Sequence, residues 1–352
     1  MASSETTGAR TVSLPALVEK VLRREDLTEA EAAAAMEEVM AGRAAPGALA
    51  GLLTALAMKG EQPHEIVGFA RTMRANAVQL AADPGTVFDT CGTGGDRAGT
   101  FNISSAAAVV VAACGVRVAK HGNRSVSSRS GSADVFEQLG VHVSADPAVV
   151  ERCLREAGIA FFFAPTFHPS MKFAGPTRRE LGIRSAFNLL GPLTNPAGAS
   201  RQIVGVPRSE LTTLVARSLA MLGSERAWVV HGADGLDELS TTGYTKVSEC
   251  RDGAVHTFYV NPAEFGLRRA RPEDLAGGDA AQNAGIVRRV LAGEAGPARD
   301  VVVYNAGASL LVAGRVASVL EGLRMAEAAI DSGAARSTLE RMARVSHEGA
   351  PA

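Results

Sequence analysis

Cysteine is scarce in this 352-residue sequence, and long apolar runs are missing. The four cysteines lie far apart and form no Cys-x-x-Cys pair. This spacing argues against a zinc site and against a disulfide framework, so we expect a reducing, cytoplasmic location. No stretch approaches the roughly 18 apolar residues of a membrane-spanning helix, and the N-terminus lacks a basic-then-apolar signal pattern. We therefore expect no membrane partner.

An excess of one charge sign is also lacking. Lysine and arginine number 36 against 37 aspartate and glutamate, which gives a formal net charge of −1. A chain with this balance has no overall basic field to hold a nucleic-acid backbone, so we expect no nucleic-acid partner. Because hydrophobic residues make up 46% and charged residues 21%, the composition is globular, and only residues 1–12 and 348–352 are expected to form loose tails.

Helix-forming segments fill the first part of the chain, residues 13–82. Apolar residues recur at helical spacing, and each segment begins or ends at Asp, Thr, Pro or Gly. The predicted helical segments are residues 15–26, 27–42, 46–60 and 63–80. This pattern predicts a small α-helical domain.

Beyond residue 82, short β-branched runs alternate with helical segments. Strands are predicted at residues 86–89, 116–120, 141–144, 159–164, 202–206 and 227–232, with a hairpin over 245–260. Helices are predicted at residues 102–115, 132–140, 146–158, 300–314, 316–333 and 335–345. Such alternation is typical of βαβ units, so we predict an α/β domain with a mainly parallel sheet.

Prolines interrupt this alternation between residues 165 and 199. We interpret 165–199 as a return to the small helical domain. The large α/β domain then comprises residues 83–164 and 200–347.

Three glycines and two aspartates crowd into DTCGTGGD, Asp89 to Asp96, behind a predicted strand. The spacing does not fit the G-x-G-x-x-G dinucleotide fingerprint, and the sequence contains no Walker G-K-[ST] motif. We interpret the segment as a loop whose amides face outward, followed by polar side chains at a helix start: Thr100, Asn102, Ser104 and Ser105. Free N–H groups and hydroxyls at a helix N-terminus favour phosphate binding. A tight turn with ordinary capping serines is the alternative.

A second polar loop, KHGNRSVSSRSGSAD, runs from Lys120 to Asp134 behind the next strand. The carboxyl ends of parallel strands lie at one edge of a sheet, where ligands of such folds bind. Lys120, Arg124, Arg129 and several serines offer cations and hydroxyls to phosphate oxygens. A solvated polar loop is the alternative, but two such loops after neighbouring strands favour one shared site.

Two further segments carry candidate ligands. Asp237 and Glu238 stand side by side in HGADGLDELS, which we expect to be an exposed loop. Adjacent carboxylates suit magnesium bound together with substrate phosphates, although a lone acidic pair is more often ordinary surface. The segment RRELGIRSAFNLLGPLTNP brings Arg178, Arg179 and Arg184 near a Gly-Pro turn, and the alternative for these arginines is helix-surface charge.

Five segments closely resemble, in their order and spacing, the anthranilate phosphoribosyltransferase family of tryptophan biosynthesis: DTCGTGGD, NISS, KHGNRSVSS, RRELGIRSAFNLLGPLTNP and HGADGLDELS. The resemblance spans nearly the whole chain. It implies a small α-helical domain beside a large α/β domain, a homodimer paired through the small domains, and Mg²⁺. It also implies transfer of the phosphoribosyl group of phosphoribosyl pyrophosphate to the amine of anthranilate, with release of pyrophosphate.

Carried over residue by residue, the resemblance implies three groups of ligands. Phosphoribosyl pyrophosphate would contact Gly92, Gly95, Asp96, Thr100, Asn102, Ile103, Ser104, Ser105, Lys120, His121, Gly122, Asn123, Arg124, Ser125, Val126, Ser127, Ser128 and Ser132. Anthranilate would lie near Gly92, Asn123, His168 and Arg178. Magnesium would be held by Ser104, Asp237 and Glu238.

The chemistry of this transfer explains why the sequence needs no nucleophile. Positive charge develops on the sugar and negative charge on the leaving pyrophosphate, so metal, lysine and amides supply the stabilisation. The aromatic amine is neutral at physiological pH, so we expect no obligatory base either. Two alternatives stay open: a pyrimidine nucleoside phosphorylase-like enzyme, which has no pyrophosphate to chelate, and a non-enzymatic relative that binds nucleic acid through a basic stripe.

Overall fold

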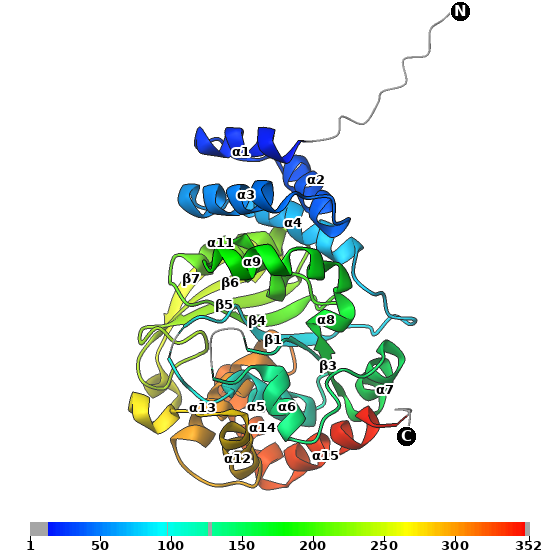
Figure 1. Cartoon of the computed structure of the whole chain (residues 1–352). Coiled ribbons are helices and arrows are strands. Elements are labelled where there is room, and N and C mark those ends of the chain that lie inside the picture. Colours follow the sequence, from blue (N-terminus) through cyan, green and yellow to red (C-terminus); the bar gives the residue numbers. More distant parts are fainter. Residues whose placement is uncertain (1–12, 97, 126–128, 349–352) are drawn as a thin grey trace, which may run out of the picture.

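The computed structural model describes residues 13–96, 98–125 and 129–348. Four helices open the chain and lie together at the top of Figure 1, as the sequence predicts. They are α1 (Leu14–Leu22), α2 (Glu29–Met40), α3 (Pro46–Lys59) and α4 (Pro63–Ala75). A capping box between Thr28 and Glu31 fixes the start of α2, and prolines stand in the first turns of α3 and α4.

A seven-stranded sheet forms the centre of the large domain, in the order β3-β2-β1-β4-β5-β6-β7. The strands are β1 (Phe88–Gly92), β2 (Val118–Gly122), β3 (Ile159–Phe163), β4 (Arg201–Gly205), β5 (Arg226–Gly232), β6 (Thr245–Arg251) and β7 (Ala254–Val260). The first five pair in parallel, whereas β5, β6 and β7 pair antiparallel. Both the mainly parallel sheet and the C-terminal hairpin of the prediction are confirmed.

One predicted strand is wrong. Residues 141–144 form no strand but a turn after helix α6 (Ser132–Gln138). The backbone N–H of Val141 donates to Phe136 O at 2.9 Å, and that of His142 donates to Ser346 Oγ at 2.9 Å. Val141 and Val143 are both buried, so their alternation reflects two contacts with the core rather than a sheet.

Helices cover both faces of the sheet (Figure 1). On one face lie α5 (Ile103–Ala113), α13 (Pro297–Val312) and α14 (Val319–Asp331), and on the other lies α11 (Leu211–Met221), which also packs on α4. The remaining helices of the large domain are α7 (Pro147–Ala157), α12 (Ala280–Leu291) and α15 (Ala334–Ser346), with 3₁₀ turns η3 (Pro262–Phe265) and η4 (Pro272–Leu275).

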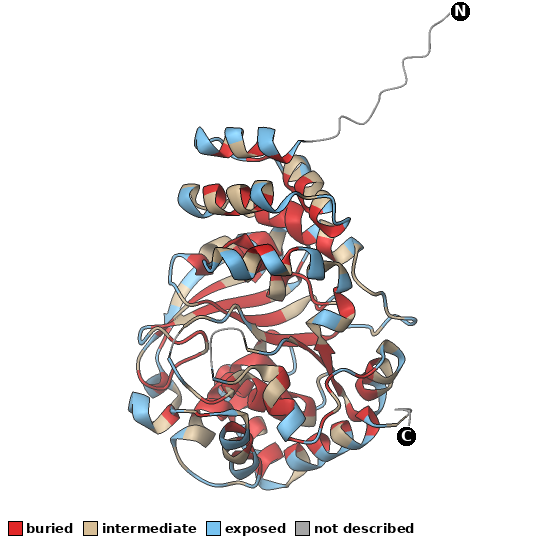
Figure 2. Cartoon of the chain, viewed as in Figure 1, coloured by how far each residue is buried: buried red, intermediate tan, exposed pale blue. Residues whose placement is uncertain are grey.

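Alternate residues of the central strands serve two separate cores. Ile203 and Trp228 belong to the core beneath the sheet with α5 and α13. Val204 and Val229 belong to the core shared with α11 and the helical domain. Successive strand residues point to opposite faces, and Figure 2 shows buried residues throughout the sheet between its helix layers.

Short helices fill the segment that the sequence assigns to the small domain. They are α8 (Ala164–Phe167), η1 (Pro169–Phe173), α9 (Gly175–Leu181), α10 (Ala186–Leu190) and η2 (Gly191–Leu193). Helix α9 packs against α3, and α10 packs against α3 and α4. These contacts support our assignment for α9 and α10, whereas α8 packs on β3 and η2 packs on β1 and β2. The boundary of the helical domain at 165–199 stays a prediction. Within the described residues, every helix is too short or too polar to cross a bilayer.

Candidate active site

Asp237 and Glu238 lie at the carboxyl edge of the sheet, beside the ends of β1 and β4. The prediction of an exposed loop is wrong, because Asp237 is only 8% exposed. Its Oδ2 accepts the backbone N–H of Gly94 at 3.1 Å. A Cβ at Gly92 would lie 2.5 Å from the same oxygen, so glycine there lets the acidic segment pack against the sheet.

A third carboxylate joins this pair. Asp96, Asp237 and Glu238 each offer an oxygen within 4.8 Å of the others. The sequence assigns Asp96 to the phosphate site alone, although it closes the glycine loop and could have been paired with the other acids. Ser104, the predicted hydroxyl ligand, lines the same pocket as Asp237 and Glu238.

The electrostatics of this acidic cluster (Asp96, Asp237 and Glu238) favour a bound cation. Burial raises the pKa of Asp237. Burial, followed by the neighbouring charges of Asp237 and Asp96, raises the pKa of Glu238 well above its usual range. Oε2 of Glu238 is buried and has no hydrogen-bond partner among the described residues. Carboxylates with a nearby hydroxyl form an oxygen donor set that suits Mg²⁺, so the residues present fit that ion.

The glycine loop turns part of its backbone inward, which corrects the prediction that its amides face outward. The N–H of Thr93 donates to Gly205 O at 2.9 Å, and that of Gly94 donates to Asp237. Two loop amides are therefore already used within the protein.

Arg184 lies across this loop, a contact that sequence reasoning missed. Gly95 has φ +82°, and a Cβ there would lie 1.7 Å from Nη1 of Arg184, so only glycine fits. Nη2 of Arg184 donates to Thr93 O at 3.4 Å. Burial lowers the pKa of Arg184, while Asp237 and Asp96 act in the opposite direction. The guanidinium thus brings a cation to the acidic cluster.

The start of α5 links the two polar loops. The side chain of Asn102 donates to Ser130 O at 3.4 Å and accepts from Asn283 Nδ2 at 3.0 Å. Ser105 is buried, and its hydroxyl has no partner among the described residues. Ile103 is fully buried, and its predicted ligand contact stays a prediction. Thr100 forms an isolated antiparallel bridge with Ala276.

Lys120 ends inside the protein rather than in solvent. It is 2% exposed, and its ammonium donates to Thr90 O on β1. It faces two acids, because its charge acts to lower the pKa of both Asp89 and Glu238. Lys120 therefore lies near enough to the acidic cluster for its charge to act on Glu238.

Asp89, on whose carboxyl the charge of Lys120 acts, is fully buried. Its carboxylate connects β1 with β2 and with the segment that holds Asn195. Its Oδ2 accepts from Asn195 Nδ2 at 2.8 Å, and its Oδ1 accepts from the N–H of His121 at 3.2 Å. Asn195 also donates to Ala119 O at 2.8 Å. Burial raises the pKa of Asp89 from 3.8 to about 6, against the lowering effect of Lys120. Neither Asp89 nor Asn195 is among the predicted site residues.

This raised pKa predicts a pH-dependent stability. A carboxyl that binds its proton more tightly in the folded state destabilises the fold as pH rises from about 4 to about 6. The full effect is about 3 kcal/mol. We would measure the melting temperatures of the parent and of Asp89→Asn across this pH range. The melting temperature of the parent should fall more steeply with rising pH, because the variant lacks the titrating carboxyl. Parallel curves for the two proteins would contradict the assignment.

Two buried histidines support the neighbouring turn. Nδ1 of His121 lies 3.0 Å from Gly191 O, and Nε2 of His168 lies 2.9 Å from Thr194 O. Their ring centroids are 5.3 Å apart. Burial lowers both pKa values, that of His121 to about 3, so both rings are neutral at physiological pH. Their predicted ligand contacts stay predictions.

The second polar loop holds its arginine within the protein. Arg124 Nη1 lies 3.0 Å from Asp134 Oδ1 and 2.8 Å from Glu137 Oε2. The backbone N–H groups of Ser125 and Gly131 donate to Asp134 Oδ2 at 3.1 and 2.9 Å. The charge of Arg124 is thus already balanced by carboxylates.

Other predicted residues of this loop are distributed as follows. Asn123 is exposed, and Ser132 Oγ donates to its carbonyl at 3.4 Å. Gly122 ends β2, where a Cβ would meet Ser132 Oγ at 2.2 Å. The predicted residues Val126, Ser127 and Ser128 lie outside the described part of the chain.

Arg178 on α9 keeps its charge available. Its guanidinium carbon lies 5.0 Å from the centroid of the Phe187 ring, and burial lowers its pKa. None of the hydrogen bonds or ion pairs among the described residues involves this guanidinium. Arg178 can therefore take an external carboxylate.

Comparison with known families gives the class of this fold and site. Residues 84–336 match the glycosyl transferase family, a/b domain, and residues 15–77 match the glycosyl transferase family, helical bundle domain. The two-domain α/β architecture predicted from the sequence is thereby confirmed.

Curated relatives are more specific. The chain is 56% identical over 329 residues to anthranilate phosphoribosyltransferase of Moorella thermoacetica, which covers 94% of this chain and 97% of the relative. It is 52% identical over 335 residues to the enzyme of the same name from Azorhizobium caulinodans, with 95% and 97% covered. The chain therefore belongs to the anthranilate phosphoribosyltransferase family, as its motifs predict.

Solved structures agree. The crystal structure of anthranilate phosphoribosyltransferase from Thermus thermophilus superposes with a TM-score of 0.87 at 44% identity, covering 94% of this chain and 99% of that one. The Saccharomyces cerevisiae enzyme in complex with phosphoribosyl pyrophosphate and Mg superposes with a TM-score of 0.86 at 27% identity, covering 95% and 98%.

Proposed function

We propose that this protein transfers the phosphoribosyl group of phosphoribosyl pyrophosphate to the amine of anthranilate in tryptophan biosynthesis. The products are N-(5-phosphoribosyl)anthranilate and pyrophosphate. The observation that carries the proposal is the acidic cluster, whose three carboxylate oxygens lie within 4.8 Å of one another beside the glycine loop. A hard cation held there is suited to a leaving group made of phosphates.

Asp237 and Glu238, with Asp96 and the nearby hydroxyl of Ser104, would hold Mg²⁺. When bound, the ion supplies neutralising charge for the departing pyrophosphate. Lys120 and Arg184 place fixed cations near the cluster, and their charges act on its carboxylates. A positive site that is already assembled stabilises developing negative charge without further rearrangement.

The phosphoribosyl group would lie between the two polar loops and the start of α5. The residues we assign to it are Gly92, Gly95, Asp96, Thr100, Asn102, Ile103, Ser104, Ser105, the segment 120–128 and Ser132. Ser105 supports this assignment with its unpartnered buried hydroxyl, and Asn102 supports it by joining the second loop to α5.

Anthranilate would lie near Gly92, Asn123, His168 and Arg178. His168 is neutral because burial lowers its pKa, so it is compatible with an uncharged amine. The guanidinium of Arg178 is free to bind the carboxylate of anthranilate. Because the amine attacks as the neutral base, alignment of the two substrates is the protein's main contribution.

The function is tested by following anthranilate fluorescence. We expect the signal to fall only when phosphoribosyl pyrophosphate and Mg²⁺ are both present. If the protein instead released a pyrimidine base from a nucleoside in phosphate buffer and left anthranilate unchanged, the phosphorylase alternative would replace this proposal.

We also infer a cytoplasmic homodimer that binds no nucleic acid. The near-zero net charge supports the lack of a nucleic-acid partner.

Leu22 on α1 and Met58 on α3 are 66% and 70% exposed, which supports pairing through the small domains. Light scattering on a sizing column should give twice the mass of 36.3 kDa, and a monomer mass would overturn the dimer.

Arg178→Ala is expected to raise KM for anthranilate by about 10- to 150-fold, since a hydrogen bond to a charged group contributes about 1.5–3 kcal/mol. KM for phosphoribosyl pyrophosphate should change little. Arg179→Ala is the matched control, because Arg179 is the exposed neighbour on the same helix. If both KM values rose together, Arg178 would instead act at the domain interface.

A further inference from the structure

We propose that Phe187 is a positioning residue for anthranilate, holding the guanidinium of Arg178 in the orientation that binds the substrate carboxylate. The inference rests on the proposed function and adds to it a residue that does not itself touch the substrate. It also gives the small helical domain a part in substrate binding.

The contact between the two side chains carries the first step. The guanidinium carbon of Arg178 lies 5.0 Å from the centroid of the Phe187 ring. An aromatic face attracts a cation at this distance, and a guanidinium stacks on it readily. Such stacking leaves the N–H groups at the edge of the guanidinium free, and these are the donors that bind a carboxylate bidentately.

Arg178 has little else to orient it. Among the described residues, no carboxylate, hydroxyl or carbonyl pairs with its guanidinium. An arginine side chain loses rotamer entropy when it is fixed in one geometry. A ring that restricts the arginine in advance therefore lowers the entropic cost of binding anthranilate.

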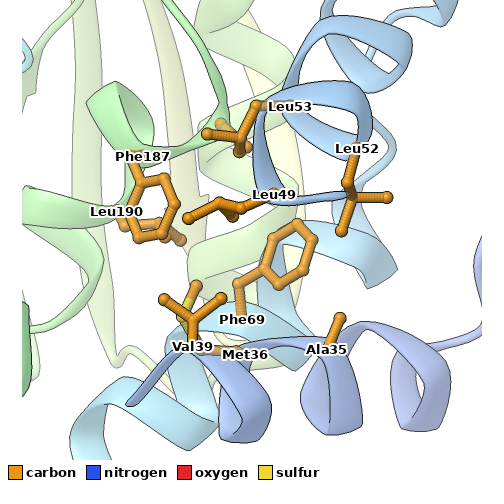
Figure 3. A pocket seen from close by; sticks show the side chains of 10 residues that line it. Ala35, Met36, Val39, Leu49, Leu52, Leu53, Phe69, Phe187 and Leu190 are labelled. Atoms are coloured by element: carbon orange, nitrogen blue, oxygen red, sulfur yellow. The ribbon is translucent and has the colours of Figure 1, made fainter. Parts of the chain in front are cut away.

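The helical domain in turn fixes the ring. Phe187 is 6% exposed and lines an apolar cavity between α10 and helices α2, α3 and α4. Figure 3 shows its ring beside Leu190, facing the cavity that Leu49, Leu53 and Phe69 also line. The start of α10 is held by a capping box between Ser185 and Asn188. The Phe187 ring thus belongs to the packed core, whereas the guanidinium of Arg178 over the ring remains available to bind a carboxylate.

Three variants test this role. Phe187→Leu keeps an apolar side chain but removes the aromatic face, and we expect KM for anthranilate to rise about 3- to 10-fold with KM for phosphoribosyl pyrophosphate unchanged. Phe187→Tyr keeps the aromatic face, so its KM for anthranilate should be close to that of the parent. Leu52→Ala is the packing control, because Leu52 lines the same cavity away from Phe187 in Figure 3. It should lower the melting temperature and leave both KM values unchanged.

A double-mutant cycle makes the test specific. In an Arg178→Ala background, Phe187→Leu should have no further effect on KM for anthranilate, because the guanidinium it positions is gone. An undiminished effect in that background, or a Phe187→Leu enzyme with the parent's KM, would overturn this inference alone. A parent protein inactive with anthranilate would overturn the proposed function as well, so the two failures are distinguishable.

Discussion

Neutralising both Asp237 and Glu238, as Asp237→Asn with Glu238→Gln, is expected to lower turnover by about 10²- to 10³-fold, because the leaving pyrophosphate loses its metal. The free protein should nevertheless melt at a higher temperature than the parent. Activity as a function of magnesium concentration, with thermal melting of the ligand-free protein, measures both effects.

The rise in melting temperature follows from burial. Both carboxyls have pKa values raised in the folded state, chiefly by burial. The folded protein therefore holds their protons more tightly than the unfolded chain does, and stability is lost as pH rises through the folded pKa values. Near neutral pH, replacing the acids with amides of the same shape removes that cost. An exposed acidic pair, as the sequence predicted, would hardly affect stability.

Asp234 provides the matched control in the same loop. Its carboxylate accepts hydrogen bonds from Ser240 Oγ at 2.8 Å, from Thr242 Oγ1 and from the N–H of Leu236 at 3.3 Å. Asp234→Asn should lower the melting temperature and keep the parent's dependence on magnesium. A double mutant that also kept this dependence would show that the acidic cluster does not hold the metal.

Periodicity explains why much of the fold could be predicted from the sequence. Helices α1 to α4 and the parallel strands follow from apolar spacing, which is a local property of the chain. The strand predicted at residues 141–144 is wrong because that prediction also relied on local apolar spacing. Val141 and Val143 alternate as strand residues do, but the chain turns there and the backbone of His142 bonds to Ser346, which is distant in sequence.

The candidate site was predictable where motifs are contiguous and not where distant residues meet. The two polar loops and the acidic pair can be recognised in short segments. The clustering of Asp96 with Asp237, the effect of the Lys120 charge on Asp89 and the pairing of Arg124 with Glu137 depend on side-chain positions that only the fold determines. Phe187 carries no local signal either, because one apolar residue in a helix usually means core.

Lys120→Met is expected to reduce kcat/KM for phosphoribosyl pyrophosphate by about 10²- to 10³-fold, since it removes a fixed cation from the edge of the acidic cluster. A loss of stability is expected as well. A lysine that is 2% exposed and faces the buried Asp89 also supports the fold, so the variant should melt well below the parent near neutral pH. Initial rates at varied phosphoribosyl pyrophosphate, with melting curves, measure both losses.

The pH dependence separates the two roles of Lys120. Asp89 has a pKa of about 6 in the folded parent, so below that pH it takes up a proton and no longer needs a cation beside it. The difference in melting temperature between parent and Lys120→Met should therefore narrow as pH falls below about 6. The catalytic defect should persist, because the pyrophosphate still lacks the lysine.

Lys59 is the matched control, a second buried lysine that lies in the helical domain, away from the sheet edge. Its Nζ lies 2.7 Å from Asp26 and 3.0 Å from Glu65, and its side chain is 5% exposed. Lys59→Met should destabilise the protein and leave both KM values near those of the parent, because it removes a buried ion pair without touching the site. If the folded Lys120→Met protein also kept the parent's kinetic constants, Lys120 would be a structural lysine like Lys59, and Arg184 would be the remaining fixed cation beside the acidic cluster.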